Sequence, residues 1–348
     1  MLRTNIFSVL ILSCICCVSA ANPIHIFMGA DDNYTMPTSV AMSSTLANHP
    51  GNDIMFHIYD FGMSHKSKDI LTSVCSKKAE LEFIPFSYET VKGLGMNICN
   101  AWPLGVFAKY WIPIYSQERG IDKAIWLDGD TVVNGDIKRL WDIELGDNYI
   151  AGVKEVAVEL SKAFCGTLQS GFCVLNAGVL LFNCKKMGDY EMLEKLRQKT
   201  LELSDKVIAV EQEVLSSVTA NHQIILPMEF NFQTLLQGVY GLTDAASYSD
   251  DSSQSLAAAA FRSIRKRVPL PSIEDVLVYH YAGKGKPWTL MGGFVPFTDL
   301  WYKYLRRTPF WGFKESLKEE VAAQSSRLFD RAVRAVGFIG KALVFKIQ

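Results

Sequence analysis

Short apolar runs recur along the chain and alternate with segments whose apolar residues have helical spacing. Runs of this length, rich in branched and aromatic residues, are typical of buried strands. Two of them, Ile24 to Met28 and Ala124 to Leu127, stop shortly before acidic residues. We expect six strands, at Ile24 to Met28, Ile54 to Tyr59, Leu81 to Phe86, Ala124 to Leu127, Tyr149 to Val153 and Val174 to Phe182.

Strands that alternate with helices predict an α/β fold in which helices flank both faces of a mostly parallel sheet. Such sheets bind ligands at the carboxyl ends of their strands. Asp31 and Asp128 each follow a predicted strand, so we expect both at that edge. The pattern therefore predicts the position of a functional site, at the carboxyl edge of the sheet, but not its chemistry.

The pattern changes at the start of the chain. Residues 1–20 contain Arg3, an apolar stretch from Ile6 to Val18 and then small residues around Ala20. This is typical of a secretory signal peptide, because about 13 apolar residues fall short of the ~20 that span a bilayer. We expect export into the secretory pathway. The alternatives are an uncleaved membrane anchor, a protein on the cytoplasmic face of a membrane, or a wrongly assigned first residue.

The C-terminal extension, residues 291–348, is rich in aromatic and basic residues. Trp301, Tyr304 and Trp311 stand close to Arg306 and Arg307, and further basic residues follow among apolar ones. This composition suits a helix that lies in the headgroup layer of a membrane, and equally a terminal helix that packs on the sheet. Peripheral membrane contact through this region is therefore one of two open interpretations.

Composition narrows the class of protein. Of the 348 residues 49% are hydrophobic and the formal net charge is −1. A large core is therefore feasible, and a nucleic-acid partner is not suggested. The length suits one large domain with appendages as well as it suits two domains, and we place the main domain at residues 22–290. Three of the eight cysteines lie in the predicted leader and five do not, so at least one thiol stays free.

The candidate chemistry centres on Asp128-Gly129-Asp130, directly after the run Ala124 to Leu127. Two acids separated by one residue at the end of a strand can hold both carboxylates on the same side, where they share a divalent cation. The tripeptide by itself also occurs as an ordinary loop or helix cap. Its interpretation therefore depends on the rest of the chain.

Three further segments accompany this turn in a fixed order. They are Gly29-Ala30-Asp31-Asp32-Asn33-Tyr34, Leu175 to Asn183, and His280-Tyr281-Ala282-Gly283-Lys284-Gly285-Lys286-Pro287-Trp288. Together the four segments resemble glycosyltransferase family 8, the retaining nucleotide-sugar transferases that include bacterial lipopolysaccharide galactosyl- and glucosyltransferases and, more distantly, glycogenin. The resemblance implies a GT-A fold over most of the chain, with a nucleotide-binding sheet.

The resemblance also implies a metal site and its neighbours. By position Asp128, Asp130 and His280 would bind Mn²⁺ or Mg²⁺ on the diphosphate of the donor. Lys286 would stabilise the negative charge of the leaving diphosphate, and Gly283 would let the backbone approach it. The alternatives are a structural histidine at 280 and a surface lysine at 286.

A donor site follows from the same resemblance. Asp31 and Asn33 would bond to the uracil edge, Tyr34 would stack on its ring, and Asn176 would face the donor sugar. Without the resemblance, the first of these segments would be an ordinary turn at a helix start, and Asn176 a strand amide bonded only to backbone. The donor-binding residues predicted in the first segment are Gly29, Ala30, Asp31, Asn33 and Tyr34.

Two segments depart from the family pattern. Glu211-Gln212-Glu213 stands where many bacterial members have Asp-Gln-Asp, and Phe107-Ala108-Lys109 where the family often has Tyr-Ala-Arg. Gln212 keeps the position proposed to lie under the anomeric carbon, whereas Glu211 is one methylene longer. Lys109 replaces a planar, two-pronged cation with a point charge. These departures bear on the donor sugar more than on the fold or the metal.

The resemblance predicts a metal-dependent hexosyltransferase that moves glucose or galactose from UDP-glucose or UDP-galactose to a saccharide or glycoconjugate acceptor. Retention of configuration by front-face displacement needs no protein nucleophile, and a double displacement through Glu211 stays open. Two other functions also stay open: a catalytically silent binder of nucleotide sugars or glycans, suggested by Glu211 and Lys109, and a UDP-sugar hydrolase.

Overall fold

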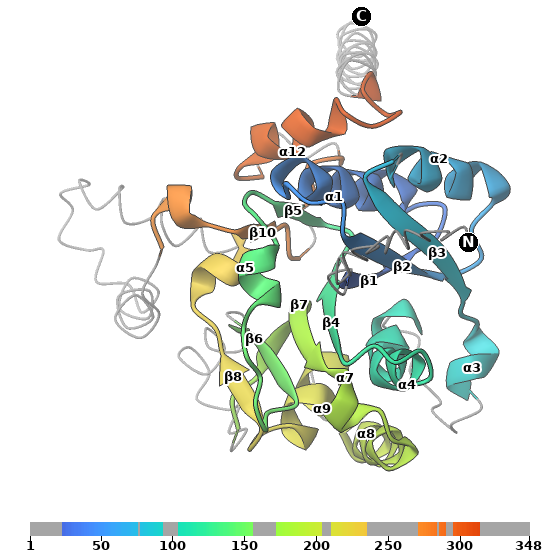
Figure 1. Ribbon diagram of the computed structural model, residues 1–348, viewed down its shortest axis with the longest axis vertical. Coiled ribbons are helices and arrows are strands. Elements are labelled where there is room, and N and C mark those ends of the chain that lie inside the picture. Colours follow the sequence, from blue (N-terminus) through green and yellow to red (C-terminus); the bar gives the residue numbers. More distant parts are fainter. Residues whose placement is uncertain are drawn as a thin grey trace, which may run out of the picture.

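A seven-stranded sheet forms the centre of the molecule, and helices cover both of its faces (Figure 1). The six predicted strands are all present, which confirms the predicted α/β fold class. The computed structural model describes residues 23–75, 77–92, 104–155, 172–203, 210–234, 271–283, 285–289 and 295–313.

The strand order in the main sheet is β3-β2-β1-β4-β7-β6-β8. All neighbours pair in parallel except β7, which runs antiparallel to both β4 and β6. The sheet is therefore mostly parallel, with a single reversed strand near its middle. The strands are β1 Ile24–Ala30, β2 Ile54–Asp60, β3 Ala79–Pro85, β4 Lys123–Leu127, β6 Ile150–Lys154, β7 Leu175–Asn183 and β8 Gln223–Ile225.

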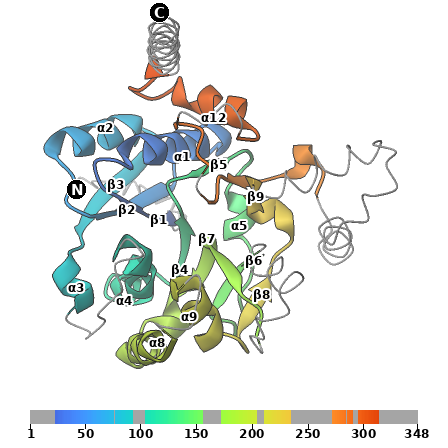
Figure 2. The same ribbon diagram turned by 180° about the vertical axis from the view of Figure 1, so that it is seen from behind.

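Alternating side chains of the strands face two separate apolar clusters. In β1, Ile26 and Met28 belong to the cluster under α1, α2 and α12, whereas Phe27 belongs to the cluster with α4, α8 and α9. Figure 2 shows the second group of helices from behind. The helices are α1 Thr35–Asn48, α2 His65–Cys75, α3 Tyr88–Lys92, α4 Ile112–Gln117, α5 Lys138–Trp141, α7 Cys184–Met187, α8 Tyr190–Leu203, α9 Val210–Val218 and α12 Thr298–Leu305, with 3₁₀ segments η1 Leu104–Trp111, η2 Met228–Phe230 and η5 Ile273–Asp275.

A second, smaller sheet crosses the carboxyl edge of the first. It has the order β5-β10-β9, and it is built from Thr131–Val133, Val278–His280 and Phe232–Gln233. β5 follows β4 after a tight turn, in which the Thr131 amide donates to the Asp128 carbonyl at 3.2 Å. β10 pairs antiparallel with β5, and His280 lies opposite Thr131. This pairing brings a late segment of the chain to the end of β4.

The start of the C-terminal extension packs against α1. Trp301 and Tyr304 of α12 are buried, and the Asn48 amide donates to the Tyr304 hydroxyl at 2.7 Å. For α12 the structure therefore agrees with the interpretation as a packed terminal helix. Residues 314–348, on which membrane contact would depend, and the predicted leader lie outside the described residues. No helix in the described ranges combines the length and the apolarity of a membrane span.

A buried histidine ties the end of α1 to two neighbouring segments. His49 Nε2 lies 2.7 Å from Asp53 Oδ1, and His49 Nδ1 lies 2.8 Å from Asp136 Oδ1. Burial lowers the pKa of His49, but the hydrogen bonds and charges of the two aspartates outweigh it, so the pKa is raised. Asp136 also accepts from the Lys138 amide at the start of α5. One imidazolium therefore stabilises three segments.

We expect His49→Gln to lower the free energy of unfolding by about 1.5–3 kcal/mol near pH 6, because two hydrogen bonds to charged groups are lost. The folded-state pKa lies above the unfolded value, so this stabilisation is complete below the unfolded pKa and is lost as pH rises through the folded one. Urea unfolding near pH 6 and pH 9 measures the difference. His65→Gln, at an exposed position of α2, is the control. Equal losses at both pH values would contradict the expectation.

Candidate active site

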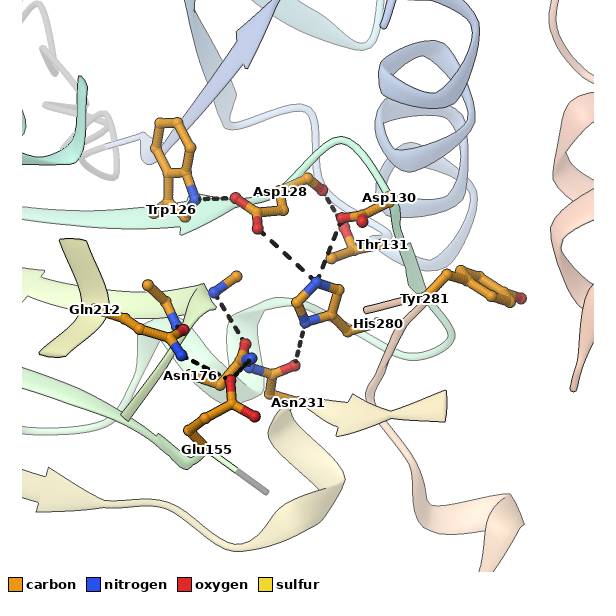
Figure 3. Close-up of polar contacts among 12 residues, drawn as sticks. Trp126, Asp128, Asp130, Thr131, Glu155, Asn176, Gln212, Asn231, His280 and Tyr281 are labelled. Carbon is orange, nitrogen blue, oxygen red and sulfur yellow. Dashed lines mark hydrogen bonds and ion pairs between the residues drawn. The ribbon is translucent and has the colours of Figure 1, made fainter. Parts of the chain in front are cut away.

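Three residues that could hold a metal ion meet where β4 and β10 end. Asp128 directly follows β4, Asp130 lies in the turn to β5, and His280 is the last residue of β10 (Figure 3). One ligand atom from each lies within 4.8 Å of the other two. His280 Nε2 is 3.4 Å from Asp130 Oδ1 and 3.8 Å from Asp128 Oδ2. The structure thus brings together the three ligands predicted from the sequence.

Asp130 is a buried carboxylate with one partnered oxygen and one open oxygen. The ammonium of Lys286 donates to Oδ2, whereas Oδ1 makes no hydrogen bond within the described ranges. Burial raises the pKa of Asp130, but the neighbouring ammonium of Lys286, through its charge and its hydrogen bond, outweighs it and holds this pKa far below its usual range. An ionised oxygen without a hydrogen bond is costly inside a protein. A hard cation is the kind of partner that this oxygen fits.

Asp128 is oriented from three sides. The indole of Trp126 donates to Asp128 Oδ1 at 2.6 Å, and the backbone amide of Asp128 donates to the Gly178 carbonyl at 2.8 Å. Lys109 Nζ lies 3.5 Å from the same Oδ1. These contacts engage one oxygen and leave Oδ2 directed toward His280 (Figure 3).

The two departures from the family pattern face each other beside this carboxylate. Lys109 is buried on η1, and its Nζ lies 3.7 Å from Glu211 Oε1 on α9. The same ammonium lies 4.9 Å from the centre of the Trp126 ring. Burial raises the pKa of Glu211, and the charge of Lys109 offsets only part of this rise. The ammonium of Lys109 therefore pairs with two acids from separate segments, Asp128 and Glu211.

The imidazole of His280 lies on the backbone of β7. A Cβ atom at Gly178 would stand 2.1 Å from His280 Cε1 and 2.8 Å from Nε2, so no other residue leaves room for the ring. We did not single out Gly178 from the sequence. The available signal was a glycine inside an otherwise apolar strand, which often marks a close approach by another group.

A line of polar side chains continues from His280 to the floor of the site (Figure 3). His280 Nδ1 is 3.1 Å from Asn231 Oδ1, and Asn231 donates to Asn176 Oδ1 at 2.8 Å. Asn176 and Gln212 donate to the same oxygen of Glu155, at 2.6 and 3.0 Å. The predicted residues Asn176 and Gln212 are thus brought together. Glu155 and Asn231 were missed, because each is a lone polar residue without a motif.

The predicted base-binding segment lies at the start of α1. Asp31 Oδ1 accepts from the Tyr34 amide at 2.8 Å, so this carboxylate also shapes the turn. The Tyr34 ring is 39% exposed and lies edge-on to Trp288, with 6.2 Å between centroids. A Cβ atom at Gly129 would stand 3.2 Å from Tyr34 Cδ1, so the ring lies beside the turn between Asp128 and Asp130. A half-open aromatic ring therefore borders the site.

The other predicted residues have varied surroundings. Gly29 leaves room for the Phe61 ring, which would lie 2.6 Å from a Cβ atom, so packing explains this glycine. Gly283 has a φ of 87°, a conformation that L side chains rarely adopt. Lys286 Nζ also donates to the Tyr281 carbonyl at 2.7 Å. Ala30 is buried at the end of β1, and Asn33 is exposed.

Comparison with known proteins identifies the family. The model of glycosyl transferase family 8 matches residues 25–292. The chain belongs to glycosyltransferase family 8. This confirms the resemblance read from the four sequence segments.

Individual relatives of this family 8 protein are distant. Glycosyltransferase GlyE of Streptococcus pneumoniae is 32% identical over 200 residues, which are 57% of this chain and 40% of GlyE. Lipopolysaccharide 1,3-galactosyltransferase of Salmonella typhimurium is 22% identical over 288 residues, which are 79% and 76% of the two chains. The chain thus spans less than half the length of GlyE.

The solved structure of the galactosyltransferase LgtC in complex with donor and acceptor sugar analogs has the same fold. The TM-score is 0.64 at 24% identity, over 82% of this chain and 96% of LgtC. This likeness confirms the predicted GT-A type of sheet.

We expect Gly178→Ala to weaken Mn²⁺ binding by at least about tenfold, because the added methyl group displaces the imidazole of His280. Titration of free Mn²⁺ by electron paramagnetic resonance measures the affinity. Gly152→Ala on β6 is a matched control, since its Cβ would press on the Leu180 side chain at 2.7 Å instead. Equal Mn²⁺ affinities of the two variants would show that Gly178 does not position the ligand.

Lys109→Met should lower the free energy of unfolding by about 3 kcal/mol at pH 8, because it leaves Glu211 buried without its cation. Chemical denaturation measures the loss. Lys195→Met, in the exposed pair with Glu191, should leave the free energy of unfolding nearly unchanged. If both substitutions had the same small effect, the buried ion pair would not have the role assigned to it.

Proposed function

We propose that this family 8 protein is a metal-dependent retaining hexosyltransferase that moves glucose or galactose from a UDP-sugar to a saccharide or glycoconjugate acceptor. The observation that carries the proposal is the meeting of Asp128, Asp130 and His280, with a carboxylate oxygen of Asp130 that has no hydrogen-bond partner in the part of the chain that the structure describes. The similar proteins, a lipopolysaccharide 1,3-galactosyltransferase and a galactosyltransferase in complex with donor and acceptor sugar analogs, support it.

The donor set suits a divalent ion. Two carboxylates and one imidazole offer the mixed oxygen and nitrogen ligands that Mn²⁺ accepts readily, and that Mg²⁺ accepts less well. A bound ion would stabilise the negative charge that develops on the diphosphate as its bond to the sugar breaks. Asp128, Asp130 and His280 are the residues that would hold it.

The side chains around these ligands have complementary tasks. Lys286 is held beside Asp130 by the Tyr281 carbonyl, so its ammonium adds positive charge where the diphosphate would lie. The positive φ of Gly283 allows the sharp turn that brings Lys286 back to the site. Tyr34 offers a partly open ring face on which a uracil base can stack.

Among the residues that the structure describes, the sugar side of the site contains oriented amides rather than a free nucleophile. Gln212 accepts from the Ala177 amide at 3.2 Å and donates to Glu155, so both ends of its side chain are engaged. Glu211 is paired with Lys109. We therefore favour front-face displacement, in which the leaving phosphate accepts the proton of the acceptor hydroxyl.

We expect the protein to release UDP from UDP-glucose or UDP-galactose with Mn²⁺ and to transfer the hexose to an added saccharide, measured by mass spectrometry. Asp130→Asn should lower the rate by about 10²- to 10³-fold, because a preorganised charge is lost. Asp142→Asn, at an exposed acid paired with Lys138, is the control.

Three outcomes would contradict parts of the proposal. If the folded protein releases UDP from no sugar nucleotide, it is not this enzyme. If calorimetry shows UDP-sugar binding with metal but the donor stays intact for hours, the protein is a binder. If UDP release is the same with and without saccharide acceptors, the activity is hydrolysis.

A further inference from the structure

Two backbone amides of β7 set the direction of the hydrogen bonds beneath the candidate metal site. The Gly178 amide donates to Asn176 Oδ1 at 3.0 Å, and the Ala177 amide donates to Gln212 Oε1 at 3.2 Å. A backbone N–H can only donate, so each of these side-chain atoms must be the carbonyl oxygen. The amino ends of Asn176 and Gln212 then point to Glu155, which accepts from both.

The hydrogen bonds of Asn176 also determine the orientation of the Asn231 side-chain amide. Because Asn176 Oδ1 is an acceptor, the atom of Asn231 that lies 2.8 Å away must be its amino nitrogen. The other end of the Asn231 amide, Oδ1, therefore faces His280 Nδ1 at 3.1 Å. An amide oxygen can only accept. The proton of a neutral His280 ring must then lie on Nδ1, and the Nε2 lone pair points toward Asp128 and Asp130.

Burial leaves this arrangement little freedom. Asn231 is fully buried, and Asn176 and His280 are 4% exposed, so water offers no ready substitute partner. Turning the Asn231 amide over would place its oxygen against the acceptor Asn176 Oδ1 and its amino group, a donor, against the N–H at His280 Nδ1. Two facing oxygens would cost the hydrogen bond and leave buried groups unsatisfied.

We propose that Asn231 is a positioning residue that holds His280 in the tautomer with its proton on Nδ1, so that Nε2 is ready as a ligand. This inference rests on the proposed metal site, to which it adds a residue outside the family segments. Glu155 anchors the line at its far end, because one carboxylate oxygen orients the amides of both Asn176 and Gln212. The metal side and the sugar side of the site thus share one hydrogen-bonded line.

Nuclear magnetic resonance of the metal-free protein tests the tautomer directly. Long-range ¹H–¹⁵N spectra of protein labelled with ¹⁵N-histidine, recorded near pH 9, distinguish a ring protonated on Nδ1 from one protonated on Nε2. The signal of His280 is identified by its loss in His280→Gln. We expect the Nδ1–H form. A ring with its proton on Nε2 would overturn the proposal, whether or not the Asn231 variants fold.

Variants then test the role of Asn231. Asn231→Ala removes the acceptor, so His280 should shift toward the Nε2–H form and Mn²⁺ affinity should fall by about 10- to 100-fold. Asn231→Asp keeps an oxygen at Nδ1 and should retain the Nδ1–H form, with an affinity closer to that of the parent. Asn48→Ala is the control, since it removes a half-buried amide with three hydrogen bonds, none of which involves His280 or its partners.

The outcomes separate this inference from the proposed function. If the parent protein binds Mn²⁺ and Asn231→Ala binds it as tightly as Asn48→Ala does, Asn231 is only structural and the inference fails. Asn231→Asp should rescue the tautomer even where it lowers stability, whereas a structural role predicts no such rescue. If the parent binds no Mn²⁺, the proposed metal site fails, and the spectra of the metal-free protein still decide the tautomer.

Discussion

The buried carboxylate of Asp130 is the group on which the arrangement of the site depends. Taking a carboxylate out of water is unfavourable unless cations and hydrogen bonds compensate. Lys286 compensates one oxygen from 156 positions away in the sequence. The Tyr281 amide donates to the Asp130 backbone carbonyl at 3.0 Å, next to the pairing of β5 with β10. The charge at the end of β4 thus holds the late segment in place, and the same charge faces the imidazole of His280.

The surroundings of this charge connect features that look independent along the chain. Lys109 and Glu211, which the sequence reading treats as departures from the family pattern, form one ion pair next to Asp128. A longer acid and a flexible lysine can meet where a shorter acid and a planar guanidinium would need different spacing. Glu155 likewise joins the amides of Asn176 and Gln212. The site therefore contains two polar clusters, one around Lys109 and one around Glu155, rather than a set of separate residues.

Much of the fold could be predicted from the sequence, because the six main strands are apolar runs between turn residues. The acids at the end of β4 could be predicted for the same reason, and the family segments located His280 and Lys286. β5, β8, β9 and β10 were not predicted, since strands of two or three residues have no readable period. Asn231, Glu155 and Gly178 were missed because their roles arise from contacts between distant segments, which no local pattern records.

The reversed direction of β7 has a consequence for how its length is used. Running against β4, it presents its beginning to the carboxyl edge, with Asn176 and Gly178 below the imidazole. Its far end, at Asn183, caps α7 and holds the neighbouring loop through the Gly146 and Asn148 carbonyls. The start of β7 therefore contributes to the candidate site, whereas its end supports the surrounding fold. Substitutions at the start of β7 would alter activity, whereas substitutions at its end would alter only stability.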